Sequence, residues 1–164
     1  MASFDVDSKL REEIIYDWFL KNEALTGHKN APLKFSQKLL EAAKAYSNFA
    51  SNRNVTGGTE RGIVNTRLLG GKSIKQHFII LMAGRHLSSA NFSSLCDEVE
   101  RTLFVWLITG TPGKEYERRI VDAAHTLRGT TDQNFEEFVR STFRRERSAL
   151  FTDFNSSSPK PQTG

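Results

Sequence analysis

The sequence predicts an all-α domain of six to seven helices, packed irregularly rather than as a symmetric bundle. Apolar residues recur at three- and four-residue spacings along most of the 164-residue chain, which is the period of an amphipathic helix. Runs that alternate apolar and polar residues, as strands do, are missing from the sequence, and no segment repeats at a fixed period. Glycine, proline and polar clusters separate the helical stretches and predict the turns.

Two helices are expected before residue 51. Asp7 or Ser8 is the expected cap of the first helix, which the segment from Gly27 to Pro32 ends. The second helix is expected from Leu33 to Ala50. The apolar stripe of the first helix is Leu10, Ile14, Ile15, Trp18 and Phe19, and that of the second is Phe35, Leu39, Leu40, Ala43, Tyr46 and Phe49.

Two helices of different character follow a polar loop at residues 51–58. The first, at residues 60–69, is short. The second is capped by Ser73 and carries apolar side chains on nearly every face between residues 78 and 82, which predicts the central and most buried helix. The residues of the short helix that are expected to point inward are Ile63, Val64 and Leu68.

Three further helices are expected in the C-terminal half. Asn91 caps the first, which Gly110 ends; Gly129 ends the second; and Asp132 caps the third. Their inward residues are Phe92, Leu95, Cys96, Val99, Leu103, Phe104 and Leu107, then Tyr116, Ile120, Ala123, Ala124 and Leu127, then Phe135, Phe138, Val139 and Phe143. We expect one helical domain over residues 1–154 and a disordered tail or linker over residues 155–164, which contain no apolar residue.

The composition is that of a globular, cytoplasmic protein. Apolar residues make up 38% of the chain and charged residues 26%, which suits a chain that folds around a core. The single cysteine, Cys96, excludes an internal disulfide and favours a reducing compartment. The N-terminus lacks a signal-peptide pattern, and the longest apolar stretch, residues 103–108, is far shorter than the roughly 20 residues of a membrane span. We therefore expect no membrane partner.

Two glycine-rich segments invite comparison with phosphate-binding loops. Gly70-Gly71-Lys72-Ser73 looks like the end of a P-loop, but Thr66 stands where that motif requires glycine, and a helix rather than a strand precedes it. The segment from Gly110 to Lys114 fails the same criteria, although free N–H groups at a helix start can hold an anion. We interpret both segments as helix ends followed by caps.

Residues suited to catalysis or metal binding are scattered. None of the histidines has partners at metal-ligand spacing, and Cys96 lies on an apolar stripe, as a structural thiol does. We therefore expect no catalytic residue, no metal site and no cofactor. The alternative is a small enzyme whose site assembles His77, His86 or Cys96 in a deep pocket. The four histidines are His28, His77, His86 and His125.

Arginines gather towards the C-terminal end. The net charge of +4 permits contact with nucleic acid without requiring it. Arg140 and Arg144 share a helix face, and such an edge can hold phosphates by charge and by paired hydrogen bonds. The opposing interpretation is that nearby glutamates pair with these arginines on a solvated surface. The candidate DNA-backbone residues are Arg118, Arg119, Arg140, Arg144 and Arg145, and the glutamates are Glu136, Glu137 and Glu146.

Several segments together show a family resemblance. They read Leu-Leu-Glu-Ala-Ala-Lys-Ala-Tyr from Leu39, Ile-Ile-Leu-Met-Ala from Ile79, Phe-Ser-Ser-Leu-Cys-Asp-Glu-Val-Glu-Arg-Thr-Leu-Phe-Val-Trp from Phe92, and Tyr-Glu-Arg-Arg-Ile from Tyr116. Over residues 10–154, this pattern resembles the helical region that follows the ParB/sulfiredoxin-like NTPase domain of GmrSD-type restriction proteins.

The resemblance implies a helical middle or connecting segment of a phage-defence protein that targets DNA. The family's Asp-Gly-Gln-Gln-Arg-like nucleotide-binding motif and its His-rich HNH nuclease motif have no counterpart in this sequence, so no catalytic residue carries over. We expect a non-enzymatic module that links neighbouring NTPase and nuclease domains, of the same or a partner chain, and contacts the DNA backbone. The alternative function is a protein–protein interaction domain that binds a partner helix in an apolar groove.

Overall fold

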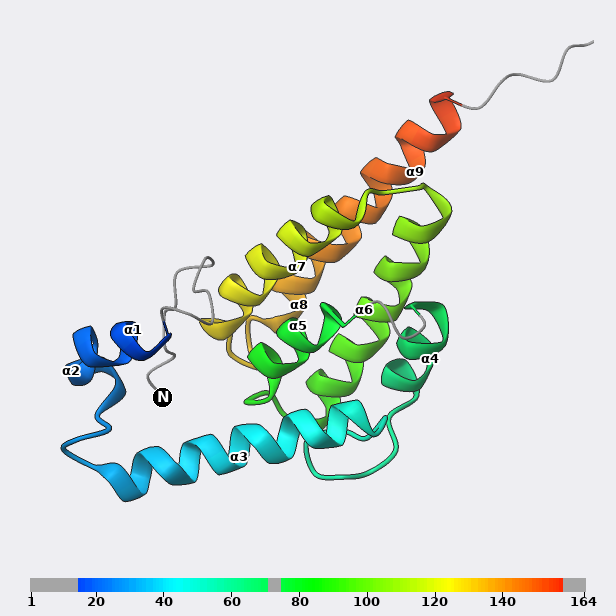
Figure 1. The fold of residues 1–164 in the computed structure, drawn as a ribbon. Helices are drawn as coiled ribbons and strands as arrows, with labels where there is room; N and C mark the ends of the chain where they lie inside the picture. Colours follow the sequence, from blue (N-terminus) through cyan, green and yellow to red (C-terminus); the bar gives the residue numbers. More distant parts are fainter. Residues whose placement is uncertain (1–14, 71–74, 158–164) are drawn as a thin grey trace, which may run out of the picture.

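The computed structural model describes residues 15–70 and 75–157, and its regular elements are helices (Figure 1). The predicted all-α class is confirmed for these residues, in which the β-type pairing is an isolated bridge between Arg53 and Thr59. The helices are α1 (Ile15–Lys21), α2 (Glu23–Thr26), α3 (Pro32–Ala50), α4 (Arg61–Gly70), α5 (His77–Gly84), α6 (Ser89–Ile108), α7 (Gly113–Arg128), α8 (Phe135–Val139), the π-helical turn η2 (Arg140–Arg144) and α9 (Arg145–Ser157).

The number of helices differs from the predicted six to seven. Because α8, η2 and α9 follow one another without a break, the described residues form eight helices. The additional helix arises because Asn22 divides the first predicted helix into α1 and α2. Helix α9 continues to Ser157, three residues past the predicted domain boundary at residue 154. The predicted residues that lie outside the described ranges are Asp7, Ser8, Leu10, Ile14, Gly71, Lys72 and Ser73, together with residues 158–164 of the predicted tail.

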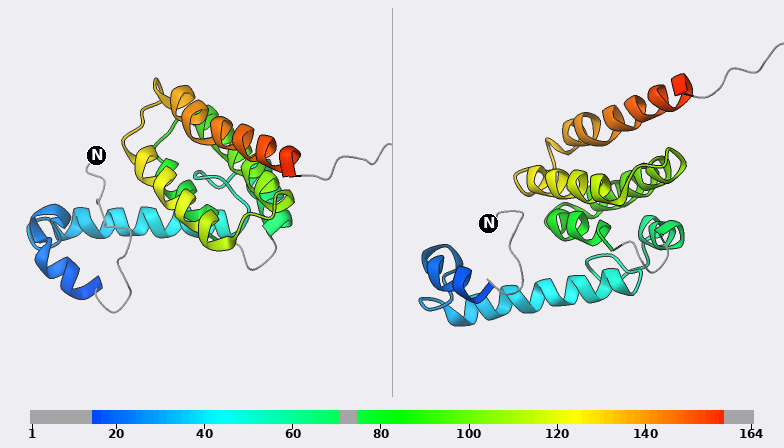
Figure 2. Two further views of the ribbon diagram at one scale, coloured as in Figure 1. Left: turned by 90° about the horizontal axis from the view of Figure 1, so that it is seen from above. Right: turned by 45° about the horizontal axis from the view of Figure 1, so that its top comes forward.

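Helix α6 occupies the centre of the fold and packs against α4, α5, α8, η2 and α9. It buries nine of its 20 residues. Helix α5 is predicted as the central and most buried helix. It does bury the largest share of its residues among the described helices, five of eight, but it packs between α3, α6 and α7, and the central helix is α6. The right-hand view of Figure 2 shows α3 on one side of the molecule and α9 on the opposite side, with helices α4 to α7 between them.

Two glycines lie at close helix contacts. A Cβ atom at Gly62 would lie 2.6 Å from the backbone carbonyl carbon of Cys96, so α4 and α6 approach each other backbone to backbone. A Cβ atom at Gly84 would lie 2.4 Å from Cδ2 of Leu95, which brings α5 close to α6. Gly62 has no room for a side chain, because real Cβ atoms do not approach a backbone so closely, whereas at Gly84 the flexible end of Leu95 would have to move.

The start of α6 is fastened to the loop before α8. Ser88, rather than the predicted Asn91, is the N-cap, and its hydroxyl accepts a hydrogen bond from the Asn91 backbone N–H. Asp132, predicted as the cap of the last helix, instead accepts bonds from the Ser88 backbone N–H at 2.9 Å and from Asn91 Nδ2 at 2.6 Å. Both hydrogen bonds lower the pKa of Asp132, and the bond from the Ser88 backbone contributes most.

The predicted core is confirmed in α7 and the last helix, whose nine predicted inward residues are all buried. In α4 and α6 the prediction is partly wrong. Ile63 is buried but Leu68 is 77% exposed, and Phe104 and Leu107 are 48% and 44% exposed. All six residues from 103 to 108 are apolar, but other helices cover only one side of α6 there. The side chains on its other side therefore stay exposed.

Helix α3 extends away from the other helices, with α1 and α2 at its far end (Figures 1 and 2). Of its 19 residues, only Ala45 and Phe49 are buried. The predicted apolar stripe is therefore wrong at Leu39, Leu40, Ala43 and Tyr46, which are exposed. A small aromatic cluster joins α1 to the start of α3, with the rings of Phe19 and Phe35 at 5.7 Å. We call residues 15–44 the arm and helices α4–α9 the bundle. None of the described helices is long and apolar enough to cross a membrane.

Candidate functional site

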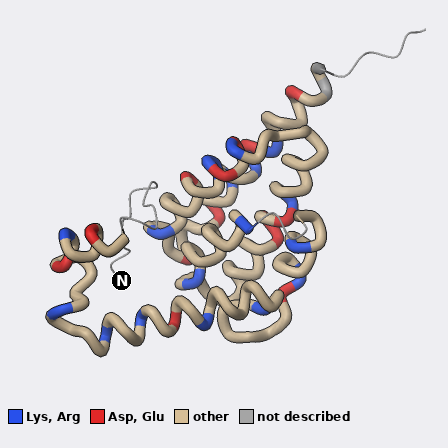
Figure 3. Tube along the Cα trace, in the orientation of Figure 1, with Lys and Arg blue, Asp and Glu red and all other residues tan. Residues whose placement is uncertain are grey.

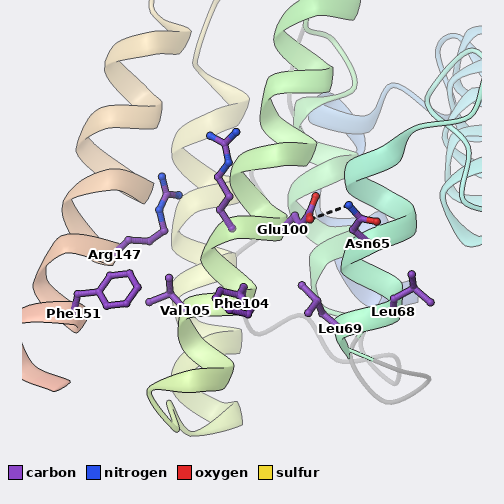
Figure 4. Close-up of a pocket in the computed structure, with 9 residues that line it drawn as sticks. Asn65, Leu68, Leu69, Glu100, Phe104, Val105, Arg147 and Phe151 are labelled. Carbon is purple, nitrogen blue, oxygen red and sulfur yellow. Dashed lines mark hydrogen bonds between the residues drawn. The ribbon is translucent and has the colours of Figure 1, made fainter. Parts of the chain in front are cut away.

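A groove of about 590 Å³ lies between α4, α6 and α9. Side chains from three helices line it, and Figure 4 shows α6 between the other two. The lining residues are Asn65, Leu68 and Leu69 from α4, Glu100, Arg101, Phe104 and Val105 from α6, and Arg147 and Phe151 from α9.

The walls of the groove are apolar and open to solvent. Leu68 and Phe104 are the most exposed of its apolar side chains, and Phe151 of α9 is 41% exposed. On α6, Leu107 and Ile108 follow Phe104 at three- and four-residue spacing and are also exposed, so they continue the same helix face. The groove therefore opens onto an apolar strip that runs towards the C-terminal end of α6.

The polar side chains of the groove already have partners within the described part of the chain. Asn65 Nδ2 donates to Glu100 Oε1 at 2.9 Å, which joins α4 to α6 across the groove (Figure 4). Arg147 Nη1 donates to Thr102 Oγ1 at 2.8 Å. Arg101 differs, because its side chain is 63% exposed and its contact with Glu98 is a longer one of 3.3 Å. Arg101 is thus the cationic group of the groove with the most freedom to meet a ligand.

A buried ion pair beneath the groove fixes the position of α9 on α6. The Glu98 side chain is 5% exposed, and its Oε2 lies 2.6 Å from Arg147 Nη1. Arg144 Nε lies 3.7 Å from Glu98 Oε1. A buried carboxylate requires such cations, because an unpaired charge in the interior is very costly. The π turn η2 ends at Arg144, three residues before Arg147, and changes the register of the helix that carries both arginines.

A second polar link joins α6, α7 and α9 on the far side of α6. Glu146 Oε1 accepts from Trp106 Nε1 at 2.7 Å and from Arg119 Nη1 at 2.6 Å. Arg119 also bonds Glu115 at 2.7 Å. Hydrogen bonds from Arg118 and Arg119 lower the pKa of Glu115 to about 2. Glu146 thus holds three helices at one point, and it keeps Arg119 within the fold.

The structure places most of the candidate DNA-backbone arginines beside carboxylates. Arg118 bonds both oxygens of Glu115, at 2.6 and 3.1 Å. Lys and Arg alternate with Asp and Glu along this part of the molecule (Figure 3). Arg145 is exposed and has no ion-pair partner among the described residues. Two further candidate arginines are paired, Arg140 with Glu137 and Arg144 with Glu136.

The residues considered for catalysis lie apart from the groove. Burial raises the pKa of the Cys96 thiol, which disfavours the reactive thiolate. Burial lowers the pKa of His77 to about 4, and neither of its ring nitrogens has a hydrogen-bond partner among the described residues. The ring nitrogens of His86 lie 2.9 and 2.8 Å from the carbonyl oxygens of Ala83 and Thr130. None of these three side chains lines the groove.

The groove was not predicted by residue. The apolar spacing predicts Leu68 and Phe104 as core residues and makes no prediction for Phe151 of α9. One signal in the sequence pointed towards it: residues 103–108 form an unbroken apolar run, which is more apolar surface than a single inward stripe uses. The position of α9, which forms one wall, depends on the Glu98–Arg147 pair, and the pattern of helical spacing does not reveal such a contact.

Comparisons with protein families, with curated proteins and with solved structures find no match to this chain. The resemblance of its helical pattern to GmrSD-type restriction proteins therefore stays a prediction.

Proposed function

We propose that this chain is a protein-interaction module and that the groove between α4, α6 and α9 binds one amphipathic helix of a partner. The observation that carries the proposal is the convergence of Leu68, Phe104 and Phe151, which expose apolar surface into one groove from three different helices. Single exposed apolar side chains are ordinary on protein surfaces. Several that gather in one hollow favour a binding site.

A partner helix fits this groove better than a small molecule does. Sites for small molecules place several polar groups so that they converge on the ligand. Here Asn65 and Glu100 bond each other, and Arg147 bonds Glu98 and Thr102. Open apolar walls with few available polar groups are typical of grooves that receive the apolar face of a helix.

Arg101 defines the charge of the expected partner. The carboxylate that contacts Arg101, Glu98, is shared with Arg147, which lies 2.6 Å from it. The exposed guanidinium of Arg101 can therefore pair with a second carboxylate. A partner glutamate or aspartate beside the apolar face would form a charge-assisted hydrogen bond there. The proposed occupant is therefore a helix with large apolar residues at positions i, i+3 and i+7 and an acidic residue at one end.

Two synthetic helical peptides test this proposal by fluorescence anisotropy. Both carry leucine at i, i+3 and i+7, and they differ by a glutamate or a lysine at one end. The unmodified protein is expected to bind the glutamate peptide more tightly, and Arg101→Glu is expected to reverse that preference. Leu68→Asp and Phe104→Asp should each weaken binding by at least about tenfold.

The matched control is Tyr16→Asp, because Tyr16 is as exposed as Leu68 but lies on α1, outside the groove. This variant should bind both peptides as the unmodified protein does. The proposal fails if neither peptide binds, or if the groove variants bind as tightly as the control.

The DNA-restriction scaffold of the GmrSD type is a second proposal. Arg145 favours it, because this exposed side chain has no ion-pair partner among the described residues and lies beside Arg144. Contacts to the DNA backbone should weaken steeply as salt rises and should not depend on base sequence. A gel-shift series in rising salt, with Arg145→Glu as the comparison, tests it. Absence of a shift at low salt would remove the DNA contact.

A further inference from the structure

Helix α3 carries an exposed seam of apolar and small residues that no described helix covers. The seam residues follow one another at alternating spacings of three and four, which places them on a single face. Every one of them is exposed, and none is charged. The α3 seam consists of Leu33, Ser36, Leu40, Ala43, Ser47 and Ala50.

The charged residues of α3 lie off the seam. Lys34, Lys38 and Glu41 occupy the other side of the helix by their spacing, and Lys44 flanks the seam. The residues of α3 that pack on the bundle form a separate stripe, in which Phe49 stacks on Phe92 at 5.6 Å. A helix normally turns its charged residues to solvent and its apolar residues to the core. The α3 seam is therefore a third face of this helix, which carries no charged residue and does not pack on the bundle.

We infer that the α3 seam is a contact between two copies of this chain, in which the two α3 helices pair antiparallel around a two-fold axis. The inference concerns a surface separate from the groove, which none of the seam residues lines. An interface around a two-fold axis must be complementary to itself, and the order of large and small residues in the seam has this property.

The complementarity follows from the sequence of the seam read in opposite directions. With Leu40 of one helix opposite Ala43 of the other, Leu33 falls opposite Ala50 and Ser36 opposite Ser47. Each leucine then meets an alanine, and the small residues let the two helices approach closely. In a parallel pair, Leu40 would meet Leu40 and Ala43 would meet Ala43, which gives layers of unequal width. Helix pairs favour layers in which large and small side chains interdigitate.

The flanks of the seam are also compatible with this arrangement. On one flank, Leu39 falls near Tyr46 of the other helix; both are about half exposed, and Tyr46 also packs on Phe78 of its own chain at 5.5 Å. On the other flank, Lys44 falls near Gln37 rather than near a second lysine. Like charges therefore do not oppose each other across the pair, and such opposition would destabilise it.

The oligomeric state of the full chain as a function of concentration is the first test. A contact made by one pair of helices lies at the small end of stable interfaces, so sedimentation equilibrium should show a reversible dimer. Ala43→Leu should raise the dissociation constant at least about tenfold, because two leucines then share one layer. The double variant Leu40→Ala/Ala43→Leu exchanges large for small on both helices and should restore the dimer.

The matched control is Glu41→Gln, an exposed change on α3 outside the seam, which should leave the dissociation constant unchanged. A chain that stays monomeric at high concentration would overturn the inference. So would a dimer that Ala43→Leu leaves intact, because the contact then lies elsewhere.

Cysteine cross-linking tests the direction of the pair. In the antiparallel pair Ser36 faces Ser47 of the other helix, so the double variant Ser36→Cys/Ser47→Cys should form a covalent dimer on mild oxidation. Ser36→Cys alone should not, because its two copies would lie roughly 16 Å apart along the helices, beyond the reach of a disulfide. The native Cys96 is buried and does not compete. Efficient cross-linking of Ser36→Cys alone would contradict the antiparallel pair.

Discussion

Helices α6 and α7 bury continuous faces, whereas α1 and most of α3 leave their apolar residues at least partly exposed. Helix α6 buries nine of its 20 residues and α7 five of its 16. Helix α1 buries none of its seven residues and α3 buries two of its 19. Both regions nevertheless have apolar residues at the same helical spacing.

The difference shows that helical spacing determines a face and does not determine what covers it. In the bundle, each apolar face meets another helix of the same chain. In the arm, the faces of α1 and α3 have few such neighbours, so a helix of this kind gains little stability from its own chain. We therefore expect the bundle to carry the stability of the monomer, and the arm to depend on contacts with other molecules.

The largest expected effect on stability comes from the charge buried in the bundle. Glu98→Ala removes the buried carboxylate that pairs with Arg147, whose side chain is 15% exposed at the groove, and should lower the free energy of unfolding by about 4 kcal/mol. The corresponding change in the arm, Glu23→Ala, breaks an exposed pair with Lys29 and should cost less than about 1 kcal/mol. Chemical denaturation measures both.

The double variant Glu98→Leu/Arg147→Met is the control, because it removes both charges together. It should recover most of the stability that Glu98→Ala loses, since an apolar pair often replaces a buried ion pair without cost. Equal losses in the bundle and the arm would contradict the comparison.

A matched pair of leucines compares the two regions directly. Leu127 of α7 is fully buried, so Leu127→Ala should lower the free energy of unfolding by about 3 kcal/mol through lost burial and a cavity. Leu39 of α3 is half exposed, and Leu39→Ala should cost less than about 0.5 kcal/mol in the monomer. Thermal unfolding at low protein concentration distinguishes them. A large loss for Leu39→Ala would mean that the arm is packed on the bundle.

Two glycines extend the comparison to the backbone. At Gly62 an added methyl meets the backbone of Cys96, and Gly62→Ala should cost about 2 kcal/mol by forcing α4 away from α6. At Gly27, φ is +66° and no atom lies within 4 Å of an added Cβ, so Gly27→Ala should cost about 1 kcal/mol through backbone strain alone. Hydrogen exchange should show Gly62→Ala loosening both α4 and α6, and an effect confined to α4 would argue against close packing.

The pH dependence of stability should report on His77 in the bundle. Its folded pKa of about 4 is below the ordinary value of 6.5, so the unfolded chain binds a proton more readily between these values. The stability that comes from a neutral His77 is therefore complete above 6.5 and is lost as the pH falls towards 4. Between about pH 7.5 and about pH 5, His77 should account for a loss of about 2 kcal/mol.

The measurement is the difference in unfolding free energy between the unmodified protein and His77→Leu at the two pH values. Subtraction cancels the contribution of the carboxylates, which are present in both proteins. The difference between the two proteins should change by about 2 kcal/mol in favour of the variant at the lower pH. A difference that does not vary with pH would show that His77 is hydrated or paired in solution.

The sequence predicted the parts of the fold that depend on local spacing. The stripes of α7 and of the last helix were predicted residue by residue, because each has one apolar face and charged residues elsewhere. Phe104 and Leu68 were assigned to the core wrongly, because apolar residues on several faces do not indicate which face a neighbour covers. The predicted cap of α6, Asn91, is wrong and the cap is Ser88. The sequence pattern does not reveal the contact of Asp132 with Ser88, because these residues lie more than 40 positions apart.

The groove and the α3 seam depend on positions that spacing alone does not give. The groove exists because α9 is held against α6 by Glu98 and Arg147, a contact across 49 positions of the sequence. The seam is visible in the sequence as a heptad pattern, but the same pattern is compatible with burial on the bundle. Only the exposure of Leu33, Leu40 and Ala43 distinguishes these two cases.

Hydrogen exchange measured at low and at high protein concentration tests the central contrast most directly. The amides of α6 and α7 should be strongly protected at both concentrations, because the bundle buries them within one chain. The amides of residues 33–46 should exchange rapidly at low concentration and become protected at high concentration, when the α3 helices pair. Protection of α3 equal to that of α6 at the lowest concentration would contradict the account, because the arm would then need no partner.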